Sequence, residues 1–133
     1  MLEANKMTRR VLVVDDDRDT VTMLCTAIKL LGYEAVPAYG GAKALEEIRR
    51  QPPHLVLLDL MMPEIDGYEV LRWMRSQPEM KTLPVVVVTA SQDRDLEPKL
   101  ARFFVTKVVR KPASLDALEK MIVSEYLTAP LAG

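Results

Sequence analysis

The stretch HLVLLDLMMPEIDG, residues His54–Gly67, decides the fold of this chain. Its aliphatic run Leu55–Leu58 is too short for a helix and is typical of a strand buried on both faces of a parallel sheet. The run ends in an acid, Asp59, and Pro63 and Gly67 mark a turn after it. Because ligands of open α/β sheets bind beyond the carboxyl ends of the strands, Asp59 is either a site residue or a surface residue that caps the turn.

Four other short segments, rich in β-branched or aliphatic residues, predict further strands. These segments are Val11–Val14, Glu34–Ala38, Val85–Val88 and Val105–Val109. Pro37 cannot donate a hydrogen bond to a neighbouring strand, so the second strand is expected at an edge of the sheet. The strands alternate with helical patterns, which predicts an α/β fold with a five-stranded parallel sheet and helices on both faces.

Apolar residues at helical spacing predict the helices between these strands. The first helix is expected to have Asp19 as its N-cap and to end before Gly32. The second is predicted over Ala42–Arg50, with an inward stripe of Ala42, Leu45 and Ile48. The third follows Gly67, and its spacing places Val70, Leu71 and Met74 in the core and Arg72 and Arg75 in water.

Two further helices are predicted near the end of the chain. Proline fits only in the first turn of a helix, so Pro98 limits the fourth helix to about Leu96–Phe103. The last helix is expected to have Ser114 as its cap and an inner stripe of Leu115, Leu118 and Ile122.

The composition is that of an ordinary globular domain, and it excludes several classes of protein. Among 133 residues, 49% are hydrophobic and 28% charged, and the net charge of −1 gives no argument for nucleic-acid binding. The single cysteine, Cys25, excludes an intrachain disulfide. No apolar run is long enough to span a membrane, and the first residues lack the apolar core of a signal peptide. We expect one cytoplasmic domain without membrane insertion.

Polar side chains follow four of the predicted strands. Asp15 and Asp16 follow the first, Asp59 the third, Thr89 the fourth and Lys111 the fifth. Parallel strands open on one edge of the sheet, so these residues are expected to converge there. Three carboxylates repel one another unless a cation lies among them, and hard oxygen ligands favour Mg²⁺. A calcium loop in the acidic run is excluded, because its glycine and terminal glutamate are missing.

A carboxylate beside Mg²⁺, a hydroxyl and an ammonium group predicts a phosphoryl-transfer site. Asp59 is expected to be the nucleophile that forms an acyl phosphate, with Mg²⁺ neutralising charge on the phosphoryl oxygens. Lys111 is expected to pair with one of these oxygens. Thr89 is expected to hydrogen-bond a second oxygen, and the backbone amide of Ala90 a third.

The segments VLVVDDD, LVLLDLMMPEIDGYEVLRWMR, VVVVTA and RKP occur in this order along the chain. With them, the sequence resembles the response-regulator receiver domains of bacterial two-component signalling over about Arg9 to Leu127. The resemblance implies a flavodoxin-like, doubly wound (βα)5 fold with strand order 2-1-3-4-5. It also divides the chain into an N-terminal extension or expression remnant at 1–8, a receiver domain at 9–127 and a tail at 128–133.

The resemblance also implies roles for individual residues. Asp59 is the phosphoacceptor, which takes its phosphoryl group from a histidine kinase or a histidine phosphotransfer protein. Asp16 binds Mg²⁺ directly, Asp15 does so through water, and the backbone carbonyl of Met61 completes the protein ligands. The Lys111–Pro112 peptide is expected to be cis. Asp17 caps the loop instead of binding metal.

A receiver of this kind is not an enzyme in the usual sense, because it catalyses only its own phosphorylation and dephosphorylation. It signals through protein–protein contacts, and we expect a monomer or weak dimer without direct nucleic-acid binding. Two alternatives remain. A receiver-like scaffold that does not use phosphate is disfavoured by the intact acids, Thr89 and Lys111. An aspartate-nucleophile phosphatase needs a second acid two residues after the nucleophile, where Met61 stands.

The sequence departs from the family pattern before the lysine. Phe104 and Val105 replace a usual Gly-Ala turn, and Val108 replaces an aromatic residue. Val108 has no ring that could swing behind Thr89, so either backbone movement near Thr89 carries the signal or the switch is blunted. We expect a reduced rearrangement between the fourth helix and the fifth strand. Of the pair Phe103–Phe104, at least one ring is expected to pack in the core.

Overall fold

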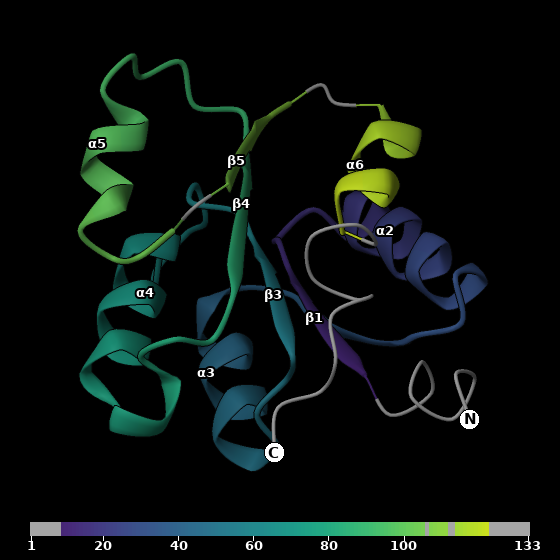
Figure 1. Cartoon of the computed structure of the whole chain (residues 1–133), viewed down its shortest axis with the longest axis horizontal. Helices are drawn as coiled ribbons and strands as arrows, with labels where there is room; N and C mark the ends of the chain where they lie inside the picture. Colours follow the sequence, from purple (N-terminus) through teal and green to yellow (C-terminus); the bar gives the residue numbers. More distant parts are fainter. Residues whose placement is uncertain (1–8, 106, 112–113, 123–133) are drawn as a thin grey trace.

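A parallel five-stranded sheet lies between two layers of helices in the computed structural model, which describes residues 9–105, 107–111 and 114–122 (Figure 1). The strand order β2-β1-β3-β4-β5 confirms the predicted flavodoxin-like topology. Helices α3, α4 and α5 cover one face, and α2 and α6 cover the other. In chain order the elements are β1 (Arg10–Val14), α2 (Arg18–Leu30), β2 (Glu34–Ala38), α3 (Gly41–Arg50), β3 (Leu55–Leu58), α4 (Gly67–Ser76), η1 (Pro78–Met80), β4 (Val85–Thr89), α5 (Leu96–Ala101), β5 (Lys107–Arg110) and α6 (Leu115–Ile122).

The central strands are buried on both faces, as their aliphatic runs predict. Every residue of β1, β3 and β4 is buried. Successive side chains of a strand point to opposite faces, so Leu58 joins the core beneath α3, α4 and α5, whereas Leu57 joins the core beneath α2. Among the described strands, β2, which contains Pro37, pairs with β1 alone and forms an edge, as predicted.

The first helix begins two residues earlier than predicted. Its N-cap is Asp17, in an extended conformation, whereas the predicted cap Asp19 lies in the first turn. At the other end the prediction is confirmed. Gly32 has φ +95° and follows the C-cap, and the N–H of Tyr33 donates to the carbonyl of Ile28 at 3.2 Å. This backbone pattern closes helices with a left-handed residue, which glycine adopts without steric cost.

The inward face of α3 differs from the predicted stripe. The predicted Ala42 is exposed, and the buried residues are Gly41, Ala44 and Ile48. The reason is the close approach of the loop before α4, because a Cβ atom on Gly41 would collide with the backbone carbonyl of Ile65. The contact sets which side of α3 faces the core, and helical spacing then adds Ala44 and Ile48.

Arg75 in α4 was predicted to face water, and that prediction is wrong. Its guanidinium is half-buried and donates three hydrogen bonds to backbone carbonyls. Nε donates to Phe103 at 2.7 Å, Nη1 to Met80 at 2.6 Å and Nη2 to Leu83 at 2.9 Å. Arg75 thereby joins the end of α4 to η1, to the segment before β4 and to the segment after α5. The predicted core residues of α4, Val70, Leu71 and Met74, are buried.

The segment between α5 and β5 is irregular. α5 ends at Ala101, two residues before the predicted end, and Pro98 lies in its first turn as predicted. Phe103 is half-buried against the core, which confirms that one ring of the pair packs inside. Phe104 is 67% exposed and has φ +59°, a conformation that non-glycine residues rarely adopt.

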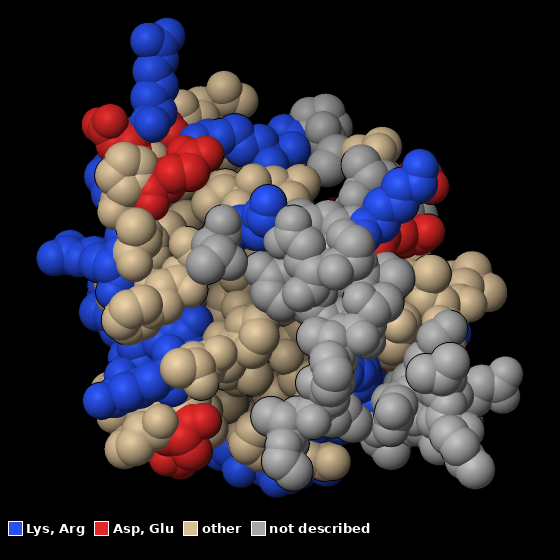
Figure 2. Space-filling view, in the orientation of Figure 1, with Lys and Arg blue, Asp and Glu red and all other residues tan. Residues whose placement is uncertain are grey.

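Some expectations lie outside the described residues. They are the Lys111–Pro112 peptide, the extension at 1–8, the tail at 128–133, and the inward positions of Leu115 and Ile122. The strand predicted at Val105–Val109 is described as β5, which starts at Lys107. On the face shown in Figure 2, basic and acidic side chains are both spread over the surface, in keeping with a net charge near zero.

Candidate functional site

The polar residues predicted from the strand ends lie at one edge of the sheet. The register pairs Val14 of β1 with Leu58 of β3, so Asp15 and Asp59 are neighbours, and the N–H of Asp59 donates to the carbonyl of Val14 at 3.0 Å. On the other side, the N–H of Lys111 donates to the carbonyl of Thr89 at 2.8 Å. The parallel topology therefore assembles the site from four strands.

Three acids form a candidate cation site at this edge. One carboxylate oxygen from each of Asp15, Asp16 and Asp59 can be chosen such that all three lie within 4.8 Å of one another. Asp15 and Asp59 are buried, and Asp16 is exposed. Carboxylate oxygens on a partly open site fit a hard divalent cation that keeps part of its water shell.

Lys111 supplies a positive charge to this acidic cluster. Its Nζ donates to Oδ2 of Asp15 at 2.7 Å and lies 3.6 Å from Oδ2 of Asp59. Burial alone would lower the pKa of the Lys111 ammonium, but the hydrogen bond to Asp15 and the charges of both acids outweigh burial and raise it. Lys111 is therefore protonated at neutral pH, and it touches both buried acids.

The pKa of Asp59 is raised despite the nearby lysine. Burial raises the pKa of its carboxyl group, and the charge of Asp15 adds to the rise. The N–H of Met61, which donates to Oδ1 of Asp59 at 3.2 Å, acts in the opposite direction. The Lys111 ammonium and a hydrogen bond from the Thr89 hydroxyl also lower this pKa, but the three together do not cancel the rise. Because the ionised form is disfavoured as it stands, a further positive charge at this edge would stabilise the carboxylate.

The loop after Asp59 is held close to the sheet. A Cβ atom on Gly67 would lie 2.5 Å from the backbone oxygen of Asp59, so only glycine fits this approach. Asp66 is the N-cap of α4 and forms a capping box with Glu69, with its side chain accepting from the Glu69 N–H at 2.9 Å. The turn residues noted in the sequence thus hold Asp59 and Met61 in place, while the side chain of Met61 is 61% exposed.

Thr89 lies at the end of β4 and is fully buried. Its Oγ accepts a hydrogen bond from the N–H of Ser91 at 3.3 Å, and Oγ of Ser91 accepts from the N–H of Asp93 at 3.2 Å. Ala90, whose amide was predicted to contact a phosphoryl oxygen, lies between them and is exposed. This short segment is the part of the site that links Thr89 to α5.

Comparison with known proteins identifies the family. The model of the response regulator receiver domain matches residues 11–123. The chain belongs to this family. The receiver is 30% identical over 118 residues to the polar-differentiation response regulator DivK of Brucella ovis, with 89% of this chain and 96% of DivK covered. It is a phosphoacceptor module of two-component signalling, and such a module has a kinase partner.

Solved structures agree with this assignment. A response regulator receiver protein from Pseudomonas putida superposes with a TM-score of 0.82 at 28% identity, covering 88% of this receiver and 97% of that chain. The Mn²⁺-bound form of the response regulator Rcp1 superposes with a TM-score of 0.80 at 29% identity, covering 94% and 99%. An acidic triad of the kind seen here is typical of receiver domains. Within the described part of this receiver, none of the helices has both the length and the apolar character of a membrane span.

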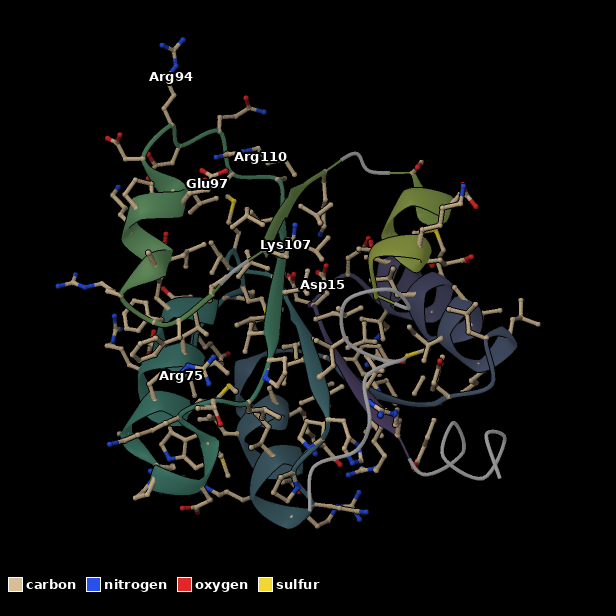
Figure 3. All side chains as sticks on the ribbon, in the orientation of Figure 1. Asp15, Arg75, Arg94, Glu97, Lys107 and Arg110 are labelled. Carbon is tan, nitrogen blue, oxygen red and sulfur yellow. The ribbon has the colours of Figure 1, made fainter. Side chains whose placement is uncertain are left out.

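One residue near the receiver site was missed by sequence reasoning. Arg110, directly before Lys111, donates from Nη1 to the carbonyl of Ser91 at 2.9 Å and from Nη2 to Oε1 of Glu97 at 2.8 Å. Its signal was present in the alternation of β5, because residues two apart share a face and Val108 was already singled out. Figure 3 shows Arg110 and Glu97 close together near the start of α5.

Proposed function

We propose that Asp59 is the phosphoacceptor of this receiver and that Mg²⁺ is its cofactor. The observation that supports the proposal is the position of the Asp59 carboxylate, which is buried beside Asp15 and 3.6 Å from the Lys111 ammonium. Asp15, Asp16, Asp59 and the backbone carbonyl of Met61 would hold the cation. When bound, it would neutralise charge on the phosphoryl oxygens.

In the proposed reaction, a carboxylate oxygen of Asp59 attacks the phosphorus atom of a phosphohistidine. A P–O bond forms and the P–N bond breaks, and the electron pair leaves on the imidazole nitrogen, which takes up a proton. Lys111 would then contact one phosphoryl oxygen, because its Nζ is already close to the attacking carboxylate. Thr89 Oγ, which already accepts from the Ser91 N–H, would donate its own proton to another, and the Ala90 amide would hydrogen-bond the third.

The proposal extends to the surroundings of the site. The phosphoryl donor would be a histidine kinase or histidine phosphotransfer protein in the cytoplasm, and the receiver unit would span residues 9–127. Signalling would pass through protein–protein contacts of a monomer or weak dimer, without direct contact to nucleic acid.

Phosphorylation by acetyl phosphate with Mg²⁺, followed by intact mass, tests this proposal. The wild-type chain is expected to gain one phosphoryl group, and EDTA is expected to prevent the gain. Asp59→Asn is expected to abolish it. Asp66→Asn is a matched control, because asparagine also caps helices and therefore preserves the turn that holds Asp59.

Two results would contradict the proposal. A mass gain that persists in Asp59→Asn would move the acceptor to another residue. The absence of any gain with acetyl phosphate, together with unchanged amide chemical shifts on adding beryllofluoride and Mg²⁺, would favour a receiver-like scaffold that does not use phosphate. This second candidate function is supported by one observation, which is that the aliphatic Val108 stands where the family has an aromatic residue.

A further inference from the structure

Arg110 lies on the face of β5 that is turned toward α5. Val108 packs against the core beneath α3, α4 and α5, and Val109 packs against the opposite core. Side chains two apart in a strand share a face, so Arg110 follows Val108. The register pairs Arg110 with Thr89 across the sheet, which brings its guanidinium beside the segment that follows Thr89.

The guanidinium of Arg110 forms a bridge between that segment and α5. Nη1 donates to the carbonyl of Ser91 at 2.9 Å, while Nη2 pairs with Oε1 of Glu97, in the first turn of α5, at 2.8 Å. The N–H of Ser91 in turn donates to Oγ of Thr89. Three hydrogen bonds therefore connect the Thr89 hydroxyl to α5 through a single side chain.

A second cation ties the same segment to α5 from the other side. Nζ of Lys99 in α5 donates to Oδ2 of Asp93 at 2.6 Å, and the N–H of Asp93 donates to Oγ of Ser91 at 3.2 Å. Figure 2 shows acidic and basic side chains side by side over this end of α5. With a bridge at both ends, the segment and the first turns of α5 are held as one unit.

We propose that Arg110 is the positioning residue that couples the Thr89 segment to α5, a role that Val108 cannot take because it has no ring. The inference rests on the proposed function of the site. When the Thr89 hydroxyl moves to donate to a phosphoryl oxygen, the Ser91 N–H that is bonded to the same Oγ follows it, and the Ser91 carbonyl shifts. Because Arg110 holds both this carbonyl and Glu97, the shift passes to α5 without any ring movement at Val108.

The test compares amide chemical shifts of the full chain before and after adding beryllofluoride with Mg²⁺. In the wild type, changes are expected near Asp59, at Thr89–Ser91 and along Leu96–Ala101. In Arg110→Gln, the changes near Asp59 and Thr89 remain, whereas those in α5 shrink by about half or more, because the ion pair to Glu97 is lost.

Three further variants distinguish loss of the link between Thr89 and α5 from a general loss of structure. Glu97→Gln removes the charge of the bridge from the exposed side of α5 without altering β5, and it should reproduce part of the loss in α5. Combining it with Arg110→Gln should add nothing to the effect of Arg110→Gln alone, because that substitution already removes the ion pair with Glu97. Arg50→Gln is the matched control, since Arg50 pairs with Glu47 at 2.8 Å on distant α3, and it should leave the α5 response intact.

The outcomes distinguish failure of the coupling from failure of the site. Undiminished α5 changes in both Arg110→Gln and Glu97→Gln would overturn the role of Arg110, while changes near Asp59 would leave the proposed function standing. Wild-type changes confined to Thr89–Ser91, without any in α5, would also overturn the coupling. If the wild type shows no change near Asp59, the proposed function fails, and the coupling fails with it.

Discussion

Charged side chains at the two ends of the parallel sheet have different kinds of interaction partner. At the carboxyl end, Asp15 and Asp59 carry charges of one sign, and Lys111 is shared between them. At the amino end, Arg75 directs three donors to three backbone carbonyls, and the side chain of Arg10 donates to the carbonyl of Gln51 at 2.8 Å. One end therefore keeps an unbalanced charge. At the other end the charges are met by backbone carbonyls and, at Arg10, by the carboxylate of Glu34, which lies 3.3 Å from Nε.

The difference separates structural from chemical roles of charged residues. A guanidinium whose donors are satisfied by backbone carbonyls stabilises the fold and has little left to offer a ligand. The ionised form of a buried carboxyl group such as Asp59 is stabilised when a cation binds beside it, so this group can still respond to a ligand. The following substitutions test whether this contrast holds.

The largest effect on stability is expected at the amino end. Arg75→Ala should lower the free energy of unfolding by about 3 kcal/mol, because it leaves three partly buried carbonyls without a charged donor. Urea denaturation measures the change. Arg72→Ala, an exposed arginine of the same helix, is the control and should stay within about 0.5 kcal/mol of the wild type. Equal effects of the two substitutions would mean that the three hydrogen bonds of Arg75 do not stabilise the fold.

The opposite sign is expected at the carboxyl end. Asp59→Asn should raise the free energy of unfolding at neutral pH by about 1 kcal/mol, because it removes one buried charge from a pair of like charges. The pKa of Asp59 is raised above its usual 3.8 in the folded chain, so its contribution to stability is complete below that pH and is lost as pH rises through the folded value.

The increase in the free energy of unfolding caused by Asp59→Asn should therefore shrink as the pH falls toward the usual pKa of aspartate, where the wild-type carboxyl group also becomes neutral. Urea denaturation of both proteins over a range of pH values measures this. A stability difference that grows toward acid pH would show that the fold stabilises Asp59 as the carboxylate. That result would contradict a raised pKa of Asp59.

The smallest effect is expected at Phe104, which lies between α5 and β5, and its neighbour Phe103 serves as the comparison. Phe104→Gly should raise the free energy of unfolding by about 0.5 kcal/mol, because relief of the positive φ exceeds the added entropy of the unfolded glycine. Phe103→Ala should lower it by about 2 kcal/mol through lost packing. Thermal and urea unfolding measure both, and a loss of stability in Phe104→Gly would mean that the exposed ring makes stabilising contacts.

The sequence by itself determined the strands, their burial and the composition of the site. Short aliphatic runs such as Leu55–Leu58 specify buried parallel strands, and the acids, Thr89 and Lys111 stand directly after such runs. Because all parallel strands open on one edge, a pattern local to each strand end was enough to predict which residues meet. The family resemblance then supplied the strand order and the proposed role of Asp59.

The tertiary structure decided what depends on distant partners. The inward face of α3 was set by contact with Ile65, and Arg75 was drawn from water by carbonyls on three other segments. Arg110 acquired its position between Ser91 and Glu97 in the same way. The periodicity of a helix or strand predicts which face is buried on average. A long polar side chain instead takes the position in which it can donate to nearby acceptors. Those acceptors come close only when the helices and strands have packed together.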